Sequence, residues 1–138
     1  EENYASFRPI YDWFVVGVLA LLAYVHGLVL ATNLGVDVSM TRALVPAVAA
    51  LYYGVGHLLD GIAPNWFVGI RTPWTLADDR VWERTHAVGG RLFKLAGVLS
   101  LGGLVAGEYA IVFLVGPVLL AALAATAYSY RAYSDVVQ

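Results

Sequence analysis

One apolar stretch decides the fold: residues 15–22 read VVGVLALL, without a polar or charged side chain. It lies inside a longer apolar run at 13–34, and similar runs follow at about 43–62, 87–107 and 109–130. Each run holds about 20 residues, which at ~1.5 Å per residue lets a helix cross a hydrocarbon core of ~30 Å. Such unbroken apolar runs lack the alternation of a barrel strand, so we expect helices. The sequence predicts an all-α, four-transmembrane-helix bundle, with residues 1–138 forming a single integral membrane domain.

The composition supports a lipid environment and excludes several classes of protein. Of the 138 residues, 60% are hydrophobic and 13% are charged, whereas soluble domains average about 45–50% and about 25%. Eight basic residues against ten acidic ones give a net charge of -2, which argues against a basic patch that binds nucleic acid. Cysteine is absent, which excludes disulfides, thiolate zinc sites and thiol nucleophiles. Because the chain begins with Glu1 and its one methionine is Met40, we expect either a trimmed start or the later part of a longer protein.

Basic residues are distributed unequally between the two ends of the predicted helices. The end that holds the termini and the long gap at 63–86 collects seven of them, and Arg42 lies at the other end. The seven are Arg8, Arg71, Arg80, Arg84, Arg91, Lys94 and Arg131. Because basic residues are retained on the cytoplasmic side, we expect a multi-pass protein of the cell membrane with both termini and the 63–86 gap in the cytoplasm.

Small residues recur at four-residue spacing within the predicted helices. The pairs are Gly103 with Gly107, Ala96 with Ser100, Ala50 with Gly54, and Ala121 with Ala125. Such pairs let helix backbones approach closely in a membrane. Packing within the bundle is the simpler interpretation, and a homo-oligomer contact is the alternative.

The gap at 63–86 combines helix-breaking and helix-starting signals. Pro64 and Pro73 exclude a continuous helix, and Gly69 permits a backbone turn. Thr75 and Asp78 have the spacing of a capping box. We therefore expect an ordered loop with a short interfacial helix that begins at about residue 76 and continues into the third span.

Several residues of this gap and of the third span carry a family resemblance. They are Asn65, the run GIRTPWTL at 69–76, Trp82, Thr85-His86, Gly89-Gly90 and Leu92-Phe93. Together they resemble the signature of the SdpI family of integral membrane proteins. The resemblance implies an immunity and signal-transduction role: protection against a secreted antimicrobial peptide toxin, with a cytoplasmic repressor held at the membrane. Typical members resemble a six-helix protein, and this chain resembles their last four helices.

The loop and the inner end of the second span supply the candidate site. We predict that Asn65, Arg71, Thr72, Trp74, Trp82 and His86 bind a ligand or partner. The guanidinium of Arg71 can clamp a carboxylate or a lipid phosphate, or it can extend to the headgroups. His57 and Asp60 share a helix face at i, i+3 spacing and are predicted to form a polar network. In that network Arg71 neutralises Asp60; a ligand pocket is the alternative.

Other chemistries receive less support from the sequence. His26, His57 and Asp60 are ionisable groups within spans, which makes a small proton-coupled transporter or ion pathway the alternative function. Zinc binding by His57, Asp60 and His86 has acceptable ligand types but no spacing motif. The sequence shows no nucleophile elbow and no phosphate-binding glycine loop. We therefore expect no enzyme activity, cofactor, metal or nucleic acid. The expected partners are the lipid bilayer, a peptide toxin, a cytoplasmic repressor and a second copy of the chain.

Overall fold

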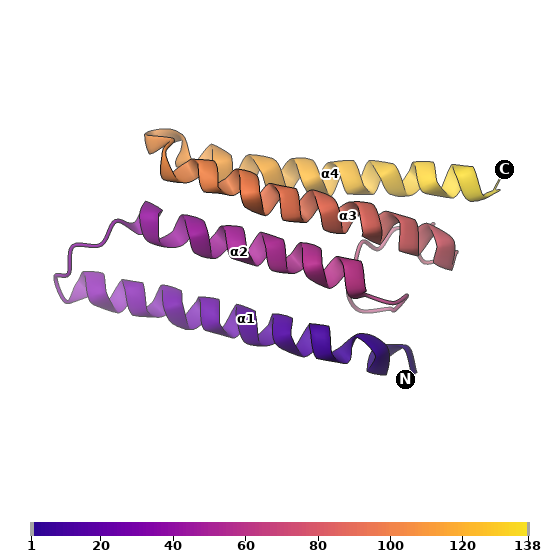
Figure 1. The fold of residues 1–138 in the computed structure, drawn as a ribbon, viewed down its shortest axis with the longest axis horizontal. Helices are drawn as coiled ribbons and strands as arrows, with labels where there is room; N and C mark the ends of the chain where they lie inside the picture. The colour runs from indigo at the N-terminus through magenta and orange to yellow at the C-terminus, as the bar shows by residue number, and fades with distance from the viewer. Residues whose placement is uncertain (1, 138) are drawn as a thin grey trace.

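The computed structural model describes the backbone of residues 2–137 and the side chains of residues 8–137. Its long elements are four helices: α1 (Glu2–Asn33), α2 (Met40–Gly61), α3 (Asp79–Ser100) and α4 (Ala110–Val137). Two short 3-10 turns, η1 (Leu101–Leu104) and η2 (Gly107–Tyr109), connect α3 to α4. Figure 1 shows the helices side by side along one axis, with both ends of the chain and the α2–α3 loop at the same end. We call this the loop end.

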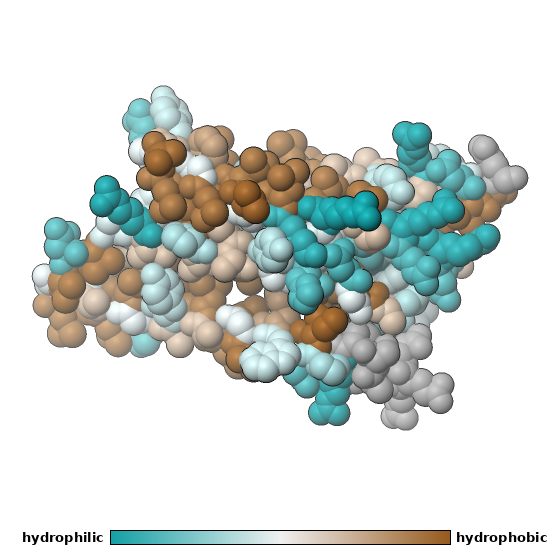
Figure 2. Space-filling model, viewed as in Figure 1, coloured by the Kyte–Doolittle hydropathy of each residue, from teal (hydrophilic) through white to brown (hydrophobic). Residues whose placement is uncertain are grey.

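Each of the four helices is long and apolar enough to cross a membrane. The candidate spans are Arg8–Asn33, Met40–Gly61, Asp79–Leu104 and Gly107–Val137. Large apolar side chains on their outer faces are exposed, and hydrophilic side chains gather mainly at the loop end (Figure 2). Such outer faces are suited to lipid rather than water. The expected all-α architecture with four apolar helices is confirmed.

Glycine brings α2 and α3 into close contact. A Cβ atom built at Gly56 would lie 2.6 Å from the carbonyl oxygen of Gly90, and one built at Gly97 would lie 2.7 Å from that of Ala49. Two contacts seven residues apart on each helix match the two-turn repeat of helices that pack side by side. The backbones therefore touch at two levels, which fixes how α3 is rotated against α2.

Two of the four expected small-residue pairs lie in the bundle interior. Ala96 and Ser100 of α3 and Ala121 and Ala125 of α4 are buried. The other two pairs differ. Ala50 and Gly54 border a cavity beside α1, and Gly107 is exposed in a turn with φ of 58° while Gly103 is buried. Gly107 thus serves the α3–α4 connection, where its positive φ suits glycine.

Helix α1 is the loosely attached member of the bundle. Of the other helices it contacts α2 alone within the described residues. None of the most apolar stretch of its span is buried, against 33% of the corresponding stretch of α3. The packed core therefore lies between α2, α3 and α4.

The α2–α3 loop, residues 62–78, differs in one respect from the expectation. A short interfacial helix from about residue 76 is not shown: residues 73–77 form turns, and α3 begins at Asp79. The cap is Asp78, whose side chain accepts a hydrogen bond from the Arg80 amide at 2.8 Å. Thr75 does not cap the helix because its hydroxyl is bonded within the loop. The predicted start is therefore three residues too early.

Candidate functional site

Asn65 folds the first turn of the loop onto itself. Its side-chain nitrogen donates to the carbonyls of Ala63 at 2.9 Å and Val68 at 3.0 Å, and its side-chain oxygen accepts from the amides of Phe67 and Val68, both at 2.8 Å. An amide side chain with its donors and acceptor used in this way is a scaffold element. The turn presents Phe67 outward, 82% exposed.

Trp82 and His86 of α3 form the buried floor under the loop. Their rings stack with centroids 4.0 Å apart, and each is almost fully buried. The indole nitrogen of Trp82 donates to the carbonyl of Ile62 at 3.0 Å, which ties the start of the loop to the first turn of α3. Trp82 and Ile62 form a buried cluster, and the partly buried Val68 and Leu76 pack against it.

The imidazole ring of His86 holds the middle of the loop, and its hydrogen bonds fix the ring in a single tautomer. Its Nε2 accepts a hydrogen bond from the Ile70 amide at 2.9 Å, so the proton must be on Nδ1, which donates to the Trp82 carbonyl at 2.9 Å. Gly69 lies directly above this stack with φ of +127°, and a Cβ there would overlap the His86 ring. Sterics and backbone conformation both require glycine at this position.

Thr72 and Thr75 lock the next turn. The hydroxyl of Thr75 accepts from the Thr72 amide at 2.8 Å and donates to the Ile70 carbonyl at 2.9 Å. The Thr75 side chain is buried, although it lies in a loop. The backbone is thereby fixed immediately before and after Arg71.

Trp74 fastens the loop to α4. Its indole nitrogen donates to the hydroxyl of Ser129 at 2.7 Å, and its ring lies edge-on to Tyr130 with centroids 5.4 Å apart. Ser129 is fully buried and donates in turn to the Thr126 carbonyl. The loop therefore contacts α3 through Trp82 and His86, and α4 through Trp74.

Arg71 is the exception among the predicted loop residues. Its side chain is exposed, and no hydrogen bond or ion pair joins it to the part of the chain that the structure describes. The two neighbouring residues are both anchored, so the structure presents this cation on a fixed backbone. An exposed guanidinium held in this way can bind a carboxylate or phosphate with two hydrogen bonds.

The predicted network of His57, Asp60 and Arg71 is not formed. Asp60 pairs with Lys94 of α3, beside the Gly56–Gly90 contact. His57 faces α1 and borders the cavity there. The i, i+3 spacing placed both residues near one end of α2 but did not determine which neighbouring helix each side chain meets. Among residues 8–137, no group of three or more His, Asp or Glu side chains could hold a metal ion.

Asp78, at the end of the loop, has a lowered pKa. The hydrogen bonds from the Arg80 guanidinium hold the pKa of Asp78 below its ordinary value of 3.8. Asp78 is therefore ionised at neutral pH, and a negative charge at a helix N-terminus is favourable.

The site includes residues that were not among the predicted site residues. They hold the loop or pair with a predicted residue: Gly69, Thr75, Lys94 and Ser129. The sequence indicated Gly69 as a turn glycine, Thr75 as a cap and Lys94 only as a basic residue, and it did not indicate Ser129. The ion pair of Asp60 with Lys94 could have been inferred from the sequence, because one apolar run contains an acidic residue and another contains a basic one. No local pattern indicates Ser129, because its partner lies 55 residues earlier.

The chain is similar in sequence to known proteins. The chain is 28% identical over 120 residues to "Immunity protein SdpI" of Bacillus subtilis (strain 168), a match that covers 86% of this chain and 58% of the relative. The chain therefore spans little more than half the length of that relative. No solved structure matches. The family model of the SdpI/YfhL proteins matches residues 62–129, from the first residue of the α2–α3 loop into α4. Residues 62–129 of this chain thus match the SdpI/YfhL protein family, and a longer part of the chain is similar to a protein named as an SdpI immunity protein.

Proposed function

We propose that this protein is an immunity and signal-transduction protein of the cell membrane, and that the α2–α3 loop is its binding site. The loop receives a secreted antimicrobial peptide toxin or reports its presence to a cytoplasmic repressor. The single observation that carries the proposal is Arg71: an exposed, unpaired cation between two anchored residues, in the segment where the family match begins. A relative named as an immunity protein supports the class of function.

Each predicted loop residue has a separate task in this proposal. Arg71 makes the contact with the partner through a carboxylate or phosphate. Asn65 and Thr72 position it through hydrogen bonds within the loop. Trp74, Trp82 and His86 position it through hydrogen bonds that join the loop to α3 and α4. Loss of a positioning residue should weaken binding through disorder of the loop, whereas loss of the Arg71 charge should weaken binding in a folded loop.

The proposal places the loop and both termini in the cytoplasm. Its support is the excess of basic residues at the loop end, which the positive-inside rule assigns to the cytoplasmic face. A peptide that acts from outside then reaches the loop through the membrane, or its effect is transmitted by the helices. Cysteine labelling at Ala77, an exposed residue of the loop, in intact and permeabilised cells measures the sidedness; labelling in intact cells would refute it.

The arrangement does not favour the proton-coupled alternative. His26 is exposed on α1, His57 borders the cavity between α1 and α2, and Asp60 pairs with Lys94 on the other side of α2. A proton pathway needs ionisable groups that follow one another within the bundle. These three groups face different surroundings, so we do not adopt transport as the function.

Survival of sensitive cells tests the proposal. The chain is expressed in Bacillus subtilis (strain 168) cells that lack their own immunity protein SdpI, and survival is measured in co-culture with the unmodified strain. We expect protection, and we expect Arg71→Ala to reduce it at least ~10-fold, as for loss of one charged contact. Arg84→Ala is the matched control, because Arg84 is an exposed arginine outside the loop. Equal survival with Arg71→Ala and Arg84→Ala, at equal membrane levels, would refute the assignment to Arg71.

A further inference from the structure

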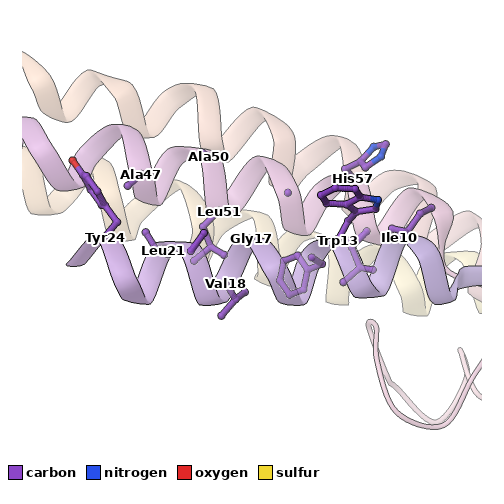
Figure 3. A pocket seen from close by; sticks show the side chains of 14 residues that line it. Ile10, Trp13, Gly17, Val18, Leu21, Tyr24, Ala47, Ala50, Leu51 and His57 are labelled. Atoms are coloured by element: carbon purple, nitrogen blue, oxygen red, sulfur yellow. The ribbon is translucent and has the colours of Figure 1, made fainter. Parts of the chain in front are cut away.

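A cavity of about 510 Å³ lies between α1 and α2, separate from the α2–α3 loop (Figure 3). Its walls are almost entirely apolar, with Phe14, Val18 and Leu21 on the α1 side and Leu51 and Leu58 on the α2 side. The cavity is comparable in size to small-molecule sites in proteins, which begin at about 300 Å³. It is therefore large enough to hold a ligand.

The cavity exists because small residues face each other across this pair of helices. Gly17 and Ala20 line it from α1, and Ala47, Ala50 and Gly54 line it from α2. Nothing lies within 4 Å of a Cβ built at Gly17, and the nearest atom to one built at Gly54 belongs to Phe14 at 4.0 Å. An empty apolar space forfeits dispersion contacts, and water finds few hydrogen-bond partners there. Hydrocarbon is the occupant that such walls favour.

The two ends of the cavity differ in polarity. Trp13 and His57 lie together at the loop end of the cavity (Figure 3). Neither side chain has a hydrogen-bond partner in the part of the chain that the structure describes, so both can bond to a ligand. At the opposite end the hydroxyl of Tyr24 already donates to the Ala43 carbonyl at 3.1 Å. This asymmetry matches an amphiphile with its polar head at the loop end.

The length of the cavity indicates which amphiphile fits. From Ile10 to Tyr24 the lining of α1 extends over ~21 Å, at 1.5 Å per residue. One leaflet of a bilayer has a hydrocarbon depth of ~15 Å, half the core. We propose that this cavity holds one acyl chain of a membrane phospholipid from the leaflet at the loop end, with the headgroup phosphate at Trp13 and His57. This lipid site is independent of the function proposed for the loop.

Glycine-to-leucine substitutions test the acyl-chain site. Gly17→Leu and Gly54→Leu place side chains into the cavity, where the structure leaves room for them. Gly27→Leu is the matched control, because Gly27 lies on the same helix outside the cavity lining and nothing lies within 4 Å of a Cβ there. The full chain is reconstituted into vesicles of phosphatidylglycerol and phosphatidylethanolamine, extracted into detergent, and analysed for retained phospholipid by mass spectrometry.

The expected result separates the cavity variants from the control. The unsubstituted chain and Gly27→Leu retain phospholipid. The two cavity variants retain at least ~10-fold less phospholipid, because two or more CH₂ groups of the acyl chain are no longer buried in the cavity. Equal retention in all four chains overturns the proposal. The proposal is also overturned if the unsubstituted chain retains no lipid and forms a dimer, and if Gly54→Leu dissociates that dimer. A second copy of the chain would then fill the cavity.

A photoactivatable phospholipid provides a measurement that does not depend on folded variants. With a diazirine in mid-chain, the proposal predicts cross-links on the unsubstituted protein concentrated at residues 14–21 and 47–54. Labelling that is equally strong on the exposed α4 residues Leu119, Leu120 and Leu123 contradicts it. His57→Phe tests the headgroup contact: preference for phosphatidylglycerol over diacylglycerol with the same chains should fall, and an unchanged preference contradicts that contact.

Discussion

Helix α2 forms two interfaces that contain the same kind of residue and have opposite outcomes. Toward α3, Gly56 meets the backbone of Gly90, and the helices touch. Toward α1, a Cβ at Gly54 would meet only the Phe14 side chain, at 4.0 Å, and a cavity of about 510 Å³ remains. Glycine thus permits close approach but does not produce it; the residues on the opposing helix decide whether the space is closed.

The match to the family model covers the tightly packed side of the molecule. The matched residues 62–129 contain the loop, α3 and most of α4, and they leave out α1 and α2. The loop is anchored to α3 and α4 by Trp82, His86 and Trp74. The packed helices α3 and α4 thus hold the candidate site, whereas the α1–α2 interface contains the cavity.

The largest effect should come from filling the α2–α3 contact. Gly90→Leu places a side chain where a Cβ would already overlap Asp60 and lie 2.8 Å from the Gly56 carbonyl. We expect a loss of about 3 kcal/mol in the free energy of unfolding, at the upper end for overpacking, measured by denaturant titration in detergent. Gly17→Leu, on the cavity side, should cost far less. Equal losses would show that the two interfaces do not differ in packing.

Substitution of Gly69 should detach the loop from its floor. Gly69→Ala combines an unfavourable positive φ with overlap on His86, and such strain costs about 2 kcal/mol. We expect faster chymotrypsin cleavage at the exposed Phe67 and a lower free energy of unfolding. The control is Gly116→Ala, because Gly116 has open space around a Cβ and lies on α4. Unchanged cleavage in Gly69→Ala would mean that the loop does not rest on His86.

Trp82 should contribute through its hydrogen bond as well as its ring. Trp82→Phe keeps an aromatic ring in the buried floor but leaves the Ile62 carbonyl without its donor, which costs about 1 kcal/mol for a buried group. The free energy of unfolding measures this loss. Trp66→Phe is the matched control, because Trp66 is 68% exposed. If both substitutions have the same effect, the Trp82 hydrogen bond does not stabilise the loop.

The smallest effect should appear at acid pH through Asp78. The pKa of Asp78 in the folded chain lies below its ordinary value of 3.8. Its contribution to stability is therefore present above that value and is lost as pH falls through the lower, folded pKa. Asn also caps helices, so Asp78→Asn should keep the cap and reduce the fall in Tm between pH 7 and pH 3. An unchanged fall would contradict this role.

The sequence predicted the helices better than their rotation about their own axes. Apolar length and composition were enough to locate the four spans, because lipid forces such runs to be helical. The start of α3 was missed because the hydroxyl of Thr75 is used by Thr72 and Ile70, which leaves the cap to Asp78. That competition depends on the path of the loop, which local spacing does not specify.

Partners across helices were the least predictable part of the site. The Asp60–Lys94 pair and the Trp74–Ser129 hydrogen bond each depend on which face α3 and α4 turn inward. That choice is made by contacts such as Gly56 on Gly90, between residues far apart in the sequence. Of the six predicted binding residues, five make hydrogen bonds that hold the loop. Arg71 alone is exposed and has no partner in the described chain.

Amide hydrogen exchange of the loop tests the central claim most directly. The amides of Val68, Ile70 and Thr72 donate to side chains of Asn65, His86 and Thr75, and no acceptor in the described chain is assigned to the amide of Arg71. In detergent micelles we expect the three bonded amides to exchange at least ~100-fold more slowly than that of Arg71. Uniformly fast exchange across residues 68–72, at the rate of an unstructured peptide, would contradict a loop anchored on α3 and α4.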